Sequence, residues 1–278
     1  MVAVVKRPSW CSRYALLALL AVGSAQADER FFNYVYEADV LPKGGWEFEQ
    51  WLTYGQRHPE GDFRYDQSRW DFREEIEFGL LERLTAAVYL NFRQDTVVGN
   101  EVGLSGFSEF SFQGVSTEFK YQLLNPVTDP VGLALYVEPT FSGSEIEMEE
   151  KLILSKNLGD YWVLAVNATV EQEWEREDGV TERESVAEFT AGAAYRITSH
   201  WSFGVEGRHR RVYEGLGWDE RLGSAWFVGP NVHYGSSRWW ATLTGLPQIS
   251  GSVPGDSRNR DWVENAGFEV RLIVGVNF

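Results

Sequence analysis

The segment FEVRLIVGVNF, residues 268–278, decides the fold of this chain. Every second residue in it is apolar, and the positions between hold glycine, asparagine or charged residues, except for Ile273. A period of two is the period of a β-strand, whose successive side chains point to opposite faces. One face of this strand is therefore apolar and the other mostly polar. Such a strand fits either a soluble β-sandwich or a membrane-spanning barrel.

The end of the sequence favours the barrel. An aromatic residue preceded by alternating apolar residues resembles the C-terminal signal that the outer-membrane assembly machinery reads. We therefore expect that machinery to be a partner of this chain. The predicted signal residues are Phe268, Val270, Leu272, Val274, Val276 and Phe278.

Eleven more segments alternate in the same way. Dividing the 251 residues after residue 27 (278 − 27) by twelve gives about 21 residues for each strand and its connection, the size expected of barrel strands of about ten residues. We predict an all-β, membrane-spanning, antiparallel up-and-down β-barrel of about 12 strands over residues 45–278. The eleven segments are 46–56, 70–80, 84–93, 109–122, 131–141, 146–155, 161–174, 185–197, 201–213, 223–234 and 239–248.

The connections alternate between short and long, as they do in bacterial outer-membrane barrels. LER (81–83) and NPVTDP (125–130) are short, whereas QRHPEGDFRYDQS (56–68) and SGSVPGDSRNRDWVEN (250–265) are long. We expect short periplasmic turns and longer extracellular loops; SGSE (142–145) is an exception. A soluble sandwich needs neither this rhythm nor the tryptophans at the strand ends, which suit interfacial girdles. These are Trp46, Trp70, Trp162, Trp201 and Trp240.

Residues 1–27 are predicted to be a cleaved signal peptide. Lys6, Arg7 and Arg13 precede or flank the short apolar run YALLALLAV, and Ala25 and Ala27 suit signal peptidase. A membrane anchor would need about 20 apolar residues. The expected location is therefore the outer membrane of a Gram-negative bacterium. Residues 28–44 are a separate N-terminal segment, which is a periplasmic extension, a lumen insert or a cap on the first strand; it is not an obvious plug of the fatty-acid transporter kind.

Composition excludes several classes of function. The formal net charge is −16, and removing the three cations of residues 1–27 gives 22 − 41 = −19. No nucleic-acid partner is expected, because phosphate binding needs a basic face. The one cysteine, Cys11, lies in the predicted signal peptide, so we expect no disulfide framework, cysteine-rich zinc module or lipoprotein anchor.

The polar face of the strands should form the lumen, because charges on a lipid-facing surface are costly. We predict as lumen-lining Arg73, Glu75, Glu77, Glu118, Lys120, Glu138, Glu147, Glu149, Lys151, Glu171, Glu173, Glu206, Arg208, Glu269 and Arg271. The same face also holds Glu47, Glu49, Glu188, Arg196 and Arg210, which makes 13 carboxylates and 7 bases. These charges either neutralise one another and fill the barrel or line an aqueous path that favours cations.

Two acidic residues, Glu74 and Glu150, fall on the apolar phase of their strands. We expect either a β-bulge that shifts the register or a position above the hydrocarbon. For Glu74, which lies within Arg73–Glu74–Glu75, a bulge or a misplaced strand boundary is favoured.

Enzyme chemistry is not predicted. No serine has an activating sequence context, and His200 and His233, which should approach each other at the periplasmic end, lack a third ligand beside them. We therefore predict no catalytic residues, no metal site and no cofactor. A lipid- or lipopolysaccharide-modifying barrel enzyme is a distant alternative.

The chain resembles the outer-membrane barrels of the MetA-pathway phenol-degradation family and related uncharacterised barrels. The resemblance is carried by LPKG (41–44) before WEFEQW (46–51), by EFGL (77–80) with ERL (82–84), and by GPNV (229–232) before WW (239–240). It implies a channel-like outer-membrane protein and carries over no site residues.

From these observations we expect a monomeric, narrow, porin-like channel that transports small solutes through a cation-favouring lumen. The alternative is a filled structural barrel without conductance. Outer-membrane lipid and lipopolysaccharide should surround it, and the solute is unknown.

Overall fold

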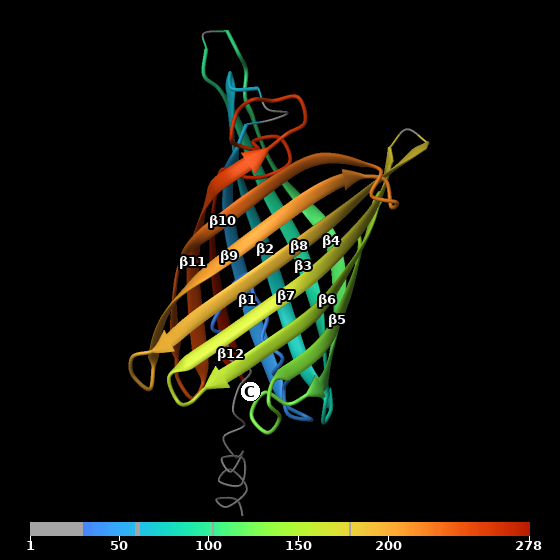
Figure 1. Cartoon of the computed structure of the whole chain (residues 1–278). Coiled ribbons are helices and arrows are strands. Elements are labelled where there is room, and N and C mark those ends of the chain that lie inside the picture. Colours follow the sequence, from blue (N-terminus) through green and yellow to red (C-terminus); the bar gives the residue numbers. More distant parts are fainter. Residues whose placement is uncertain (1–29, 59–61, 102, 178) are drawn as a thin grey trace, which may run out of the picture.

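Twelve antiparallel strands close into one barrel in the computed structural model, which describes residues 30–58, 62–101, 103–177 and 179–278 (Figure 1). Each strand pairs with its neighbours in sequence, and the first pairs with the last. The predicted all-β up-and-down barrel with twelve strands is confirmed. The strands are β1 (Trp46–Arg57), β2 (Tyr65–Leu81), β3 (Leu84–Gly99), β4 (Phe107–Leu124), β5 (Gly132–Phe141), β6 (Glu145–Leu158), β7 (Trp162–Glu177), β8 (Val180–Arg196), β9 (Trp201–Glu214), β10 (Glu220–Gly235), β11 (Trp239–Ser252) and β12 (Phe268–Asn277).

The decisive C-terminal segment closes the sheet. β12 pairs with β1 without interruption from Glu47↔Asn277 to Gln56↔Phe268, and its other side pairs with β11. Closure leaves no unpaired strand edge in the apolar zone, where unsatisfied backbone groups are costly. The side chains of Phe268 and Phe278 are exposed on the outer surface.

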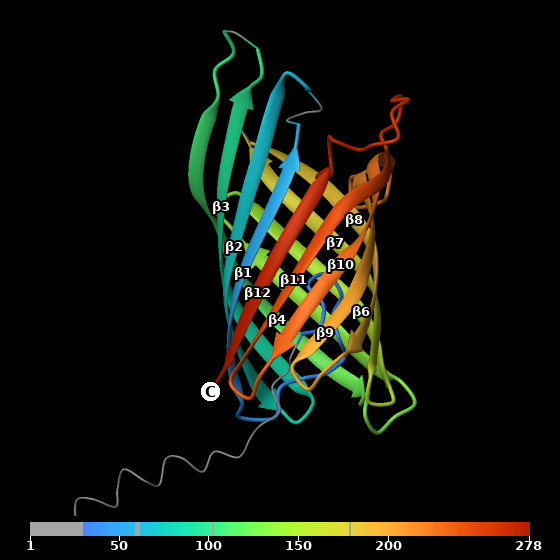
Figure 2. The same ribbon diagram turned by 90° about the vertical axis from the view of Figure 1, so that its left-hand side faces the viewer.

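The two ends of the barrel differ in their connections. The end that holds the C-terminus and the connection between β2 and β3 is called the turn end, and the opposite end, which holds the long connection between β11 and β12, the loop end (Figures 1 and 2). Several strands run further toward the loop end than predicted. β7 and β8, for example, leave only residues 178–179 between them, because alternation continues there with polar residues on both faces.

The outer surface carries a belt of apolar side chains. Leu90, Leu152 and Phe203 each expose more than two fifths of their surface on this face. At the turn end, rings pair along the rim, as in Trp46 with Phe78, whose ring centroids lie 5.2 Å apart. An exposed apolar belt with an aromatic girdle is the surface of a barrel embedded in lipid. Within the described ranges, no helix is long and apolar enough to cross a membrane.

The predicted bulge at Glu74 is wrong. Pairing runs in register through Gln50↔Glu74↔Leu90, and β6 likewise passes through Glu150 without a shift. Both carboxylates therefore face outward. Glu74 accepts a hydrogen bond from Gln50 Nε2 (3.3 Å), which satisfies part of its demand for a donor on an apolar surface.

Candidate functional site: the barrel lumen

Residues 30–41, called here the inner segment, lie inside the barrel toward the turn end (Figure 2). The sequence left open whether this region lies in the lumen, and gave no sign of a plug. Phe32 and Val35 are fully buried although no regular element contains them. The inner segment thus occupies the lumen in the manner of a plug.

Side chains of the barrel wall hold the backbone of the inner segment. Asn167 pairs with Tyr36 in both directions: Tyr36 N donates to Asn167 Oδ1 (2.7 Å), and Asn167 Nδ2 donates to the Tyr36 carbonyl (2.9 Å). Ala38 N donates to Ser155 Oγ (2.9 Å), and Gln122 Nε2 donates to the Ala38 carbonyl (2.9 Å). The wall therefore satisfies main-chain groups that a strand would otherwise satisfy.

Glu206 provides the strongest of these anchors. Its side chain is completely buried and accepts hydrogen bonds from Asn33 N (3.0 Å), Tyr34 N (2.7 Å) and Thr244 Oγ1 (2.6 Å). A carboxylate that accepts several donors is stabilised in its charged form, even away from water. This acidic residue fixes the start of the inner segment.

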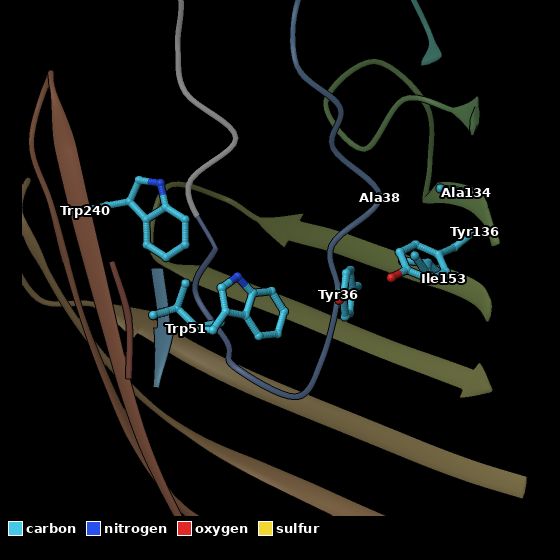
Figure 3. Packing of buried hydrophobic residues seen from close by; sticks show 8 residues of the cluster. Tyr36, Ala38, Trp51, Ala134, Tyr136, Ile153 and Trp240 are labelled. Atoms are coloured by element: carbon cyan, nitrogen blue, oxygen red, sulfur yellow. The ribbon is translucent and has the colours of Figure 1, made fainter. Parts of the chain in front are cut away.

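Apolar contacts complete the fit. Tyr36 lies between Trp51 on one side and Tyr136 and Ile153 on the other (Figure 3). The ring of Phe32 covers Gly192, where an added Cβ would lie only 2.7 Å from a ring carbon. The absence of a side chain at this position lets the inner segment approach the wall.

Charges of the turn half are largely neutralised within the packed interior. Lys151 forms an ion pair with Glu149, and Lys120 lies 3.9 Å from Glu77. The indole Nε1 of Trp51 donates to Glu49 (2.7 Å) and Glu75 (3.1 Å). Buried charges of this kind are tolerated because they are paired and hydrogen-bonded.

The loop half contains open space instead. A chamber of about 450 Å³ lies between the walls and adjoins a second cavity of about 230 Å³ and an outer cavity of about 820 Å³ through shared lining residues. Arg208 forms ion pairs with Glu188 (2.6 Å) and Glu269 (2.9 Å) in this region. The chamber is lined by Thr53, Gly55, Arg57, Arg69, Asp71, Arg93, Glu145, Glu147, Glu171, Glu173, Glu184, Arg208, Arg210, Glu264, Asn265, Ala266 and Glu269.

The connection between β11 and β12 folds over the chamber. Asp261 is fully buried and accepts hydrogen bonds from the backbone of Glu264 (3.0 Å) and from Asn265 Nδ2 (2.7 Å). Burial, together with the nearby Asp261 carboxylate, raises the pKa of Glu264. Trp262 packs on His58 in the connection between β1 and β2. The longest connection, between β11 and β12, is thereby joined to that between β1 and β2.

All fifteen lumen residues proposed from the sequence point inward, but they divide between the two halves. Glu147, Glu171, Glu173, Arg208 and Glu269 line the chamber. Arg73, Glu138 and Arg271 line the adjoining cavity. The packed turn half contains Glu75, Glu77, Glu118, Lys120, Glu149, Lys151 and Glu206.

Several chamber residues were missed. Arg57 and Arg69 lie one residue beyond the predicted segments 46–56 and 70–80, and both continue the inward phase of their strands. Extending each alternation past its last apolar residue would have found them. No group of three or more His, Cys, Asp or Glu side chains among the described residues is arranged to hold a metal ion.

Comparison with known proteins identifies a family and a shared fold. The model of a family of unknown function, DUF6662, matches residues 24–278. Among curated proteins, none matches the sequence.

Three solved barrels illustrate the structural similarity. An outer-membrane channel from Pseudomonas putida F1 is 12% identical, with a TM-score of 0.63 over 87% of this chain and 98% of that one. The NanC porin is 11% identical (TM-score 0.50; 84% and 100% covered). The translocator domain of the autotransporter NalP from Neisseria meningitidis is 11% identical (TM-score 0.51; 87% and 91% covered). The predicted resemblance to outer-membrane barrels is confirmed at the level of the fold.

Proposed function

The chain belongs to the DUF6662 family of unknown function, and we propose that it is an outer-membrane channel for small water-soluble solutes. The fold, which is also that of an outer-membrane channel from Pseudomonas putida F1, supports the proposal. Fold alone does not carry function. The observation that carries the proposal is a charged chamber at the loop end whose path toward the turn end is blocked by the inner segment.

The channel opens when the inner segment leaves the lumen. Much of its attachment consists of hydrogen bonds between wall side chains and its backbone, such as those to Ala38 and Leu41 (2.9 Å each). Such bonds exchange with water at a modest net cost of about 1 kcal/mol each. No covalent link within the described residues ties the inner segment to the strands except the chain itself, through Pro42–Gly45.

The open channel favours cations. Carboxylates outnumber guanidinium groups in the chamber, and the outer cavity adds Glu175, Glu182, Glu214 and Asp219 against Arg183. A narrow path with excess negative charge in a low-dielectric wall concentrates cations and repels anions. The protein transports solutes and carries out no chemical reaction.

Export and topology follow the sequence pattern. Residues 1–27, which act as a cleaved signal peptide in this proposal, lie outside the described residues. In the assembled barrel the loop end faces the cell exterior. Cysteine at Ser257 should react with an impermeant thiol reagent on whole cells, and cysteine at Thr128 should not. The reverse labelling would overturn the orientation.

Assembly depends on the exposed aromatic residue of the C-terminal segment, Phe278. Replacing it with serine should lower the amount of heat-modifiable barrel in the outer membrane while export to the periplasm continues. Unchanged outer-membrane levels would contradict a role for Phe278 in recognition by the assembly machinery. Lipid and lipopolysaccharide surround the assembled monomer.

Single-channel recording of refolded protein in planar bilayers tests the function. The wild type should show rare openings, and a variant lacking residues 30–41 should conduct continuously with cation preference. A deletion variant that is folded by heat-modifiable migration and does not conduct would contradict the proposal.

A reversible lock tests the gate without deleting it. Ser155 Oγ lies 2.9 Å from Ala38 N, and the sequence after residue 27 has no cysteine of its own. The double variant Ala38→Cys with Ser155→Cys should be silent when oxidised and recover wild-type openings on reduction. Each single variant is the matched control and should not respond to oxidant.

A filled structural barrel is the second candidate. Its support is the packing of the turn half, where Trp51, Tyr89 and Trp240 project from the wall and are almost completely buried. This candidate requires that the lumen remain closed without the inner segment. Absence of conductance in both the wild type and the deletion variant would favour it.

A further inference from the structure

The chamber has two walls of opposite character. Arg57, Arg69 and Arg93 stand on the adjacent strands β1, β2 and β3. In a closed barrel of twelve strands, β7 and β8 lie opposite β1 and β2. On that side, β6, β7 and β8 present a row of glutamates to the same chamber. A solute in the chamber therefore meets three guanidinium groups beside Asp71 on one side and mainly carboxylates on the other.

The three arginines share one mode of attachment. Each donates a hydrogen bond from Nε: Arg57 to Gln67 (3.0 Å), Arg69 to Asp95 (3.0 Å) and Arg93 to Asp71 (2.7 Å). Their terminal nitrogen atoms form no hydrogen bond to another described residue. Guanidinium groups fixed in this way are preorganised to donate to a carboxylate, because little side-chain freedom is lost on binding.

Part of the glutamate wall lacks ion-pair partners, although Glu171 pairs with Arg210 (3.8 Å). Glu147 lies directly opposite Glu173 in the pairing of β6 with β7, and Glu173 lies opposite Glu184 in the pairing of β7 with β8. None of these three forms an ion pair with a described residue. Like charges placed directly across neighbouring strands are destabilising. A bound ammonium group would relieve this repulsion.

The wall beyond the chamber recognises a peptide backbone. Asn167, Ser155 and Gln122 bind main-chain amides of the inner segment, and Asn231 donates to the Phe31 carbonyl (2.6 Å). When the inner segment leaves, these side chains need new partners because they line a narrow path. An extended peptide offers the same alternating N–H and C=O groups.

From these two observations we propose that the solute is a short peptide, which enters the chamber with its carboxylate toward Arg57 and Arg93 and its ammonium toward Glu147 and Glu173. The proposal deepens the proposed channel function, on which its biological meaning rests. A volume of about 450 Å³ is within the range of small-molecule sites. An amino acid would fill only a small part of it.

Calorimetric titration of the refolded barrel in detergent at low salt tests the proposal and does not depend on conductance. Trialanine should bind. N-acetyl-trialanine, trialanine amide and free alanine should each bind at least about tenfold more weakly, because each loses a charge-assisted contact or the backbone contacts. Equal affinity for a capped peptide or for alanine would overturn the peptide assignment, and tighter binding of putrescine would replace it with a purely cationic ligand.

Paired variants assign the two ends. The double variant Arg57→Gln with Arg93→Gln should abolish the preference for a peptide with a free carboxylate. The double variant Glu147→Gln with Glu173→Gln should abolish the preference for a peptide with a free ammonium group. Arg64→Gln and Glu101→Gln each remove one charge, of either sign, at the loop end outside the chamber and should leave both preferences intact. If the double arginine variant does not fold, Arg57→Gln alone, which breaks no ion pair with a described residue, should weaken trialanine binding.

The outcomes separate this proposal from that of channel function. Trialanine binding by a barrel that never conducts would refute the channel and retain the site. Conductance by a folded barrel that binds none of the peptides would refute the site and retain the channel.

Discussion

The turn half and the loop half of the lumen are built from the same strands and the same alternation, yet their charged side chains have opposite surroundings. In the turn half, Glu206 and Glu49 are buried and accept hydrogen bonds from the inner segment or from the wall. In the loop half, Glu147 and Glu173 face each other beside open space. A carboxylate in the barrel interior is thus either packed and hydrogen-bonded within the protein or accessible to water and solutes, depending on its surroundings.

The largest contrast should appear at the tryptophans. Trp51 is almost fully buried in the turn half, where it contacts the inner segment, so Trp51→Ala should lower the free energy of unfolding by about 3–5 kcal/mol. Trp218, in the connection between β9 and β10, is 39% exposed, and Trp218→Ala should change it by less than about 0.5 kcal/mol. Urea unfolding in lipid vesicles measures both. Similar losses would remove the distinction between a packed and an open half.

Glu206 tests whether turn-half carboxylates are structural. Glu206→Gln replaces one acceptor oxygen by a donor, so at least one of the two backbone N–H groups loses its partner. We expect a loss of about 1.5–3 kcal/mol in the same unfolding assay, and more frequent channel openings. A variant with full stability and unchanged openings would show that the inner segment does not depend on this anchor.

The corresponding substitution in the chamber should change the free energy of unfolding only slightly, and in the opposite direction. Glu147→Gln removes one of two opposed carboxylates, so stability should stay unchanged or rise by up to about 1 kcal/mol. Cation preference, measured as the reversal potential in a salt gradient with the deletion of residues 30–41 as background, should fall. Marked destabilisation would mean that Glu147 has a structural partner.

The smallest expected effect concerns pH. Because burial beside Asp261 raises the pKa of Glu264 above the ordinary 4.5, this group takes up a proton earlier than an exposed glutamate as the pH falls. The chamber then loses one negative charge, and the protonated form that the fold favours becomes populated, so stability does not fall in this step. Cation preference should therefore decline at a pH above 4.5. Glu264→Gln should show a smaller decline than the wild type, and an unchanged decline would assign it to other chamber carboxylates.

Sequence alternation predicted the strands well because the lipid side of a barrel requires mostly apolar residues, and these then recur with a period of two. It failed at the loop ends of β7 and β8, because strands that extend beyond the apolar belt carry polar residues on both faces. The same limit hid Arg57 and Arg69.

The inner segment was beyond the reach of sequence patterns for a different reason. It has no regular structure, and its partners are distant in the chain; Asn33, for instance, donates to the carbonyl of Arg271, 238 positions away. Alternation placed all fifteen proposed residues on the inner face, but which of them line open space depends on where the inner segment lies. Local periodicity contains no information about that.

The rim of the barrel is uneven, and this has a consequence for main-chain hydrogen bonding. β5 ends at Phe141, paired with β6, whereas β4 begins at Phe107 and pairs with β5 only from Val115 onward. The stretch of β4 from Phe107 to Gly114 therefore has one side without a neighbouring strand, above a register shift opposite Asn91 and Phe92. A sheet that is closed within the apolar belt thus reopens beyond it. The main-chain N–H and C=O groups on this free side have no strand to pair with, so they rely on water at the rim.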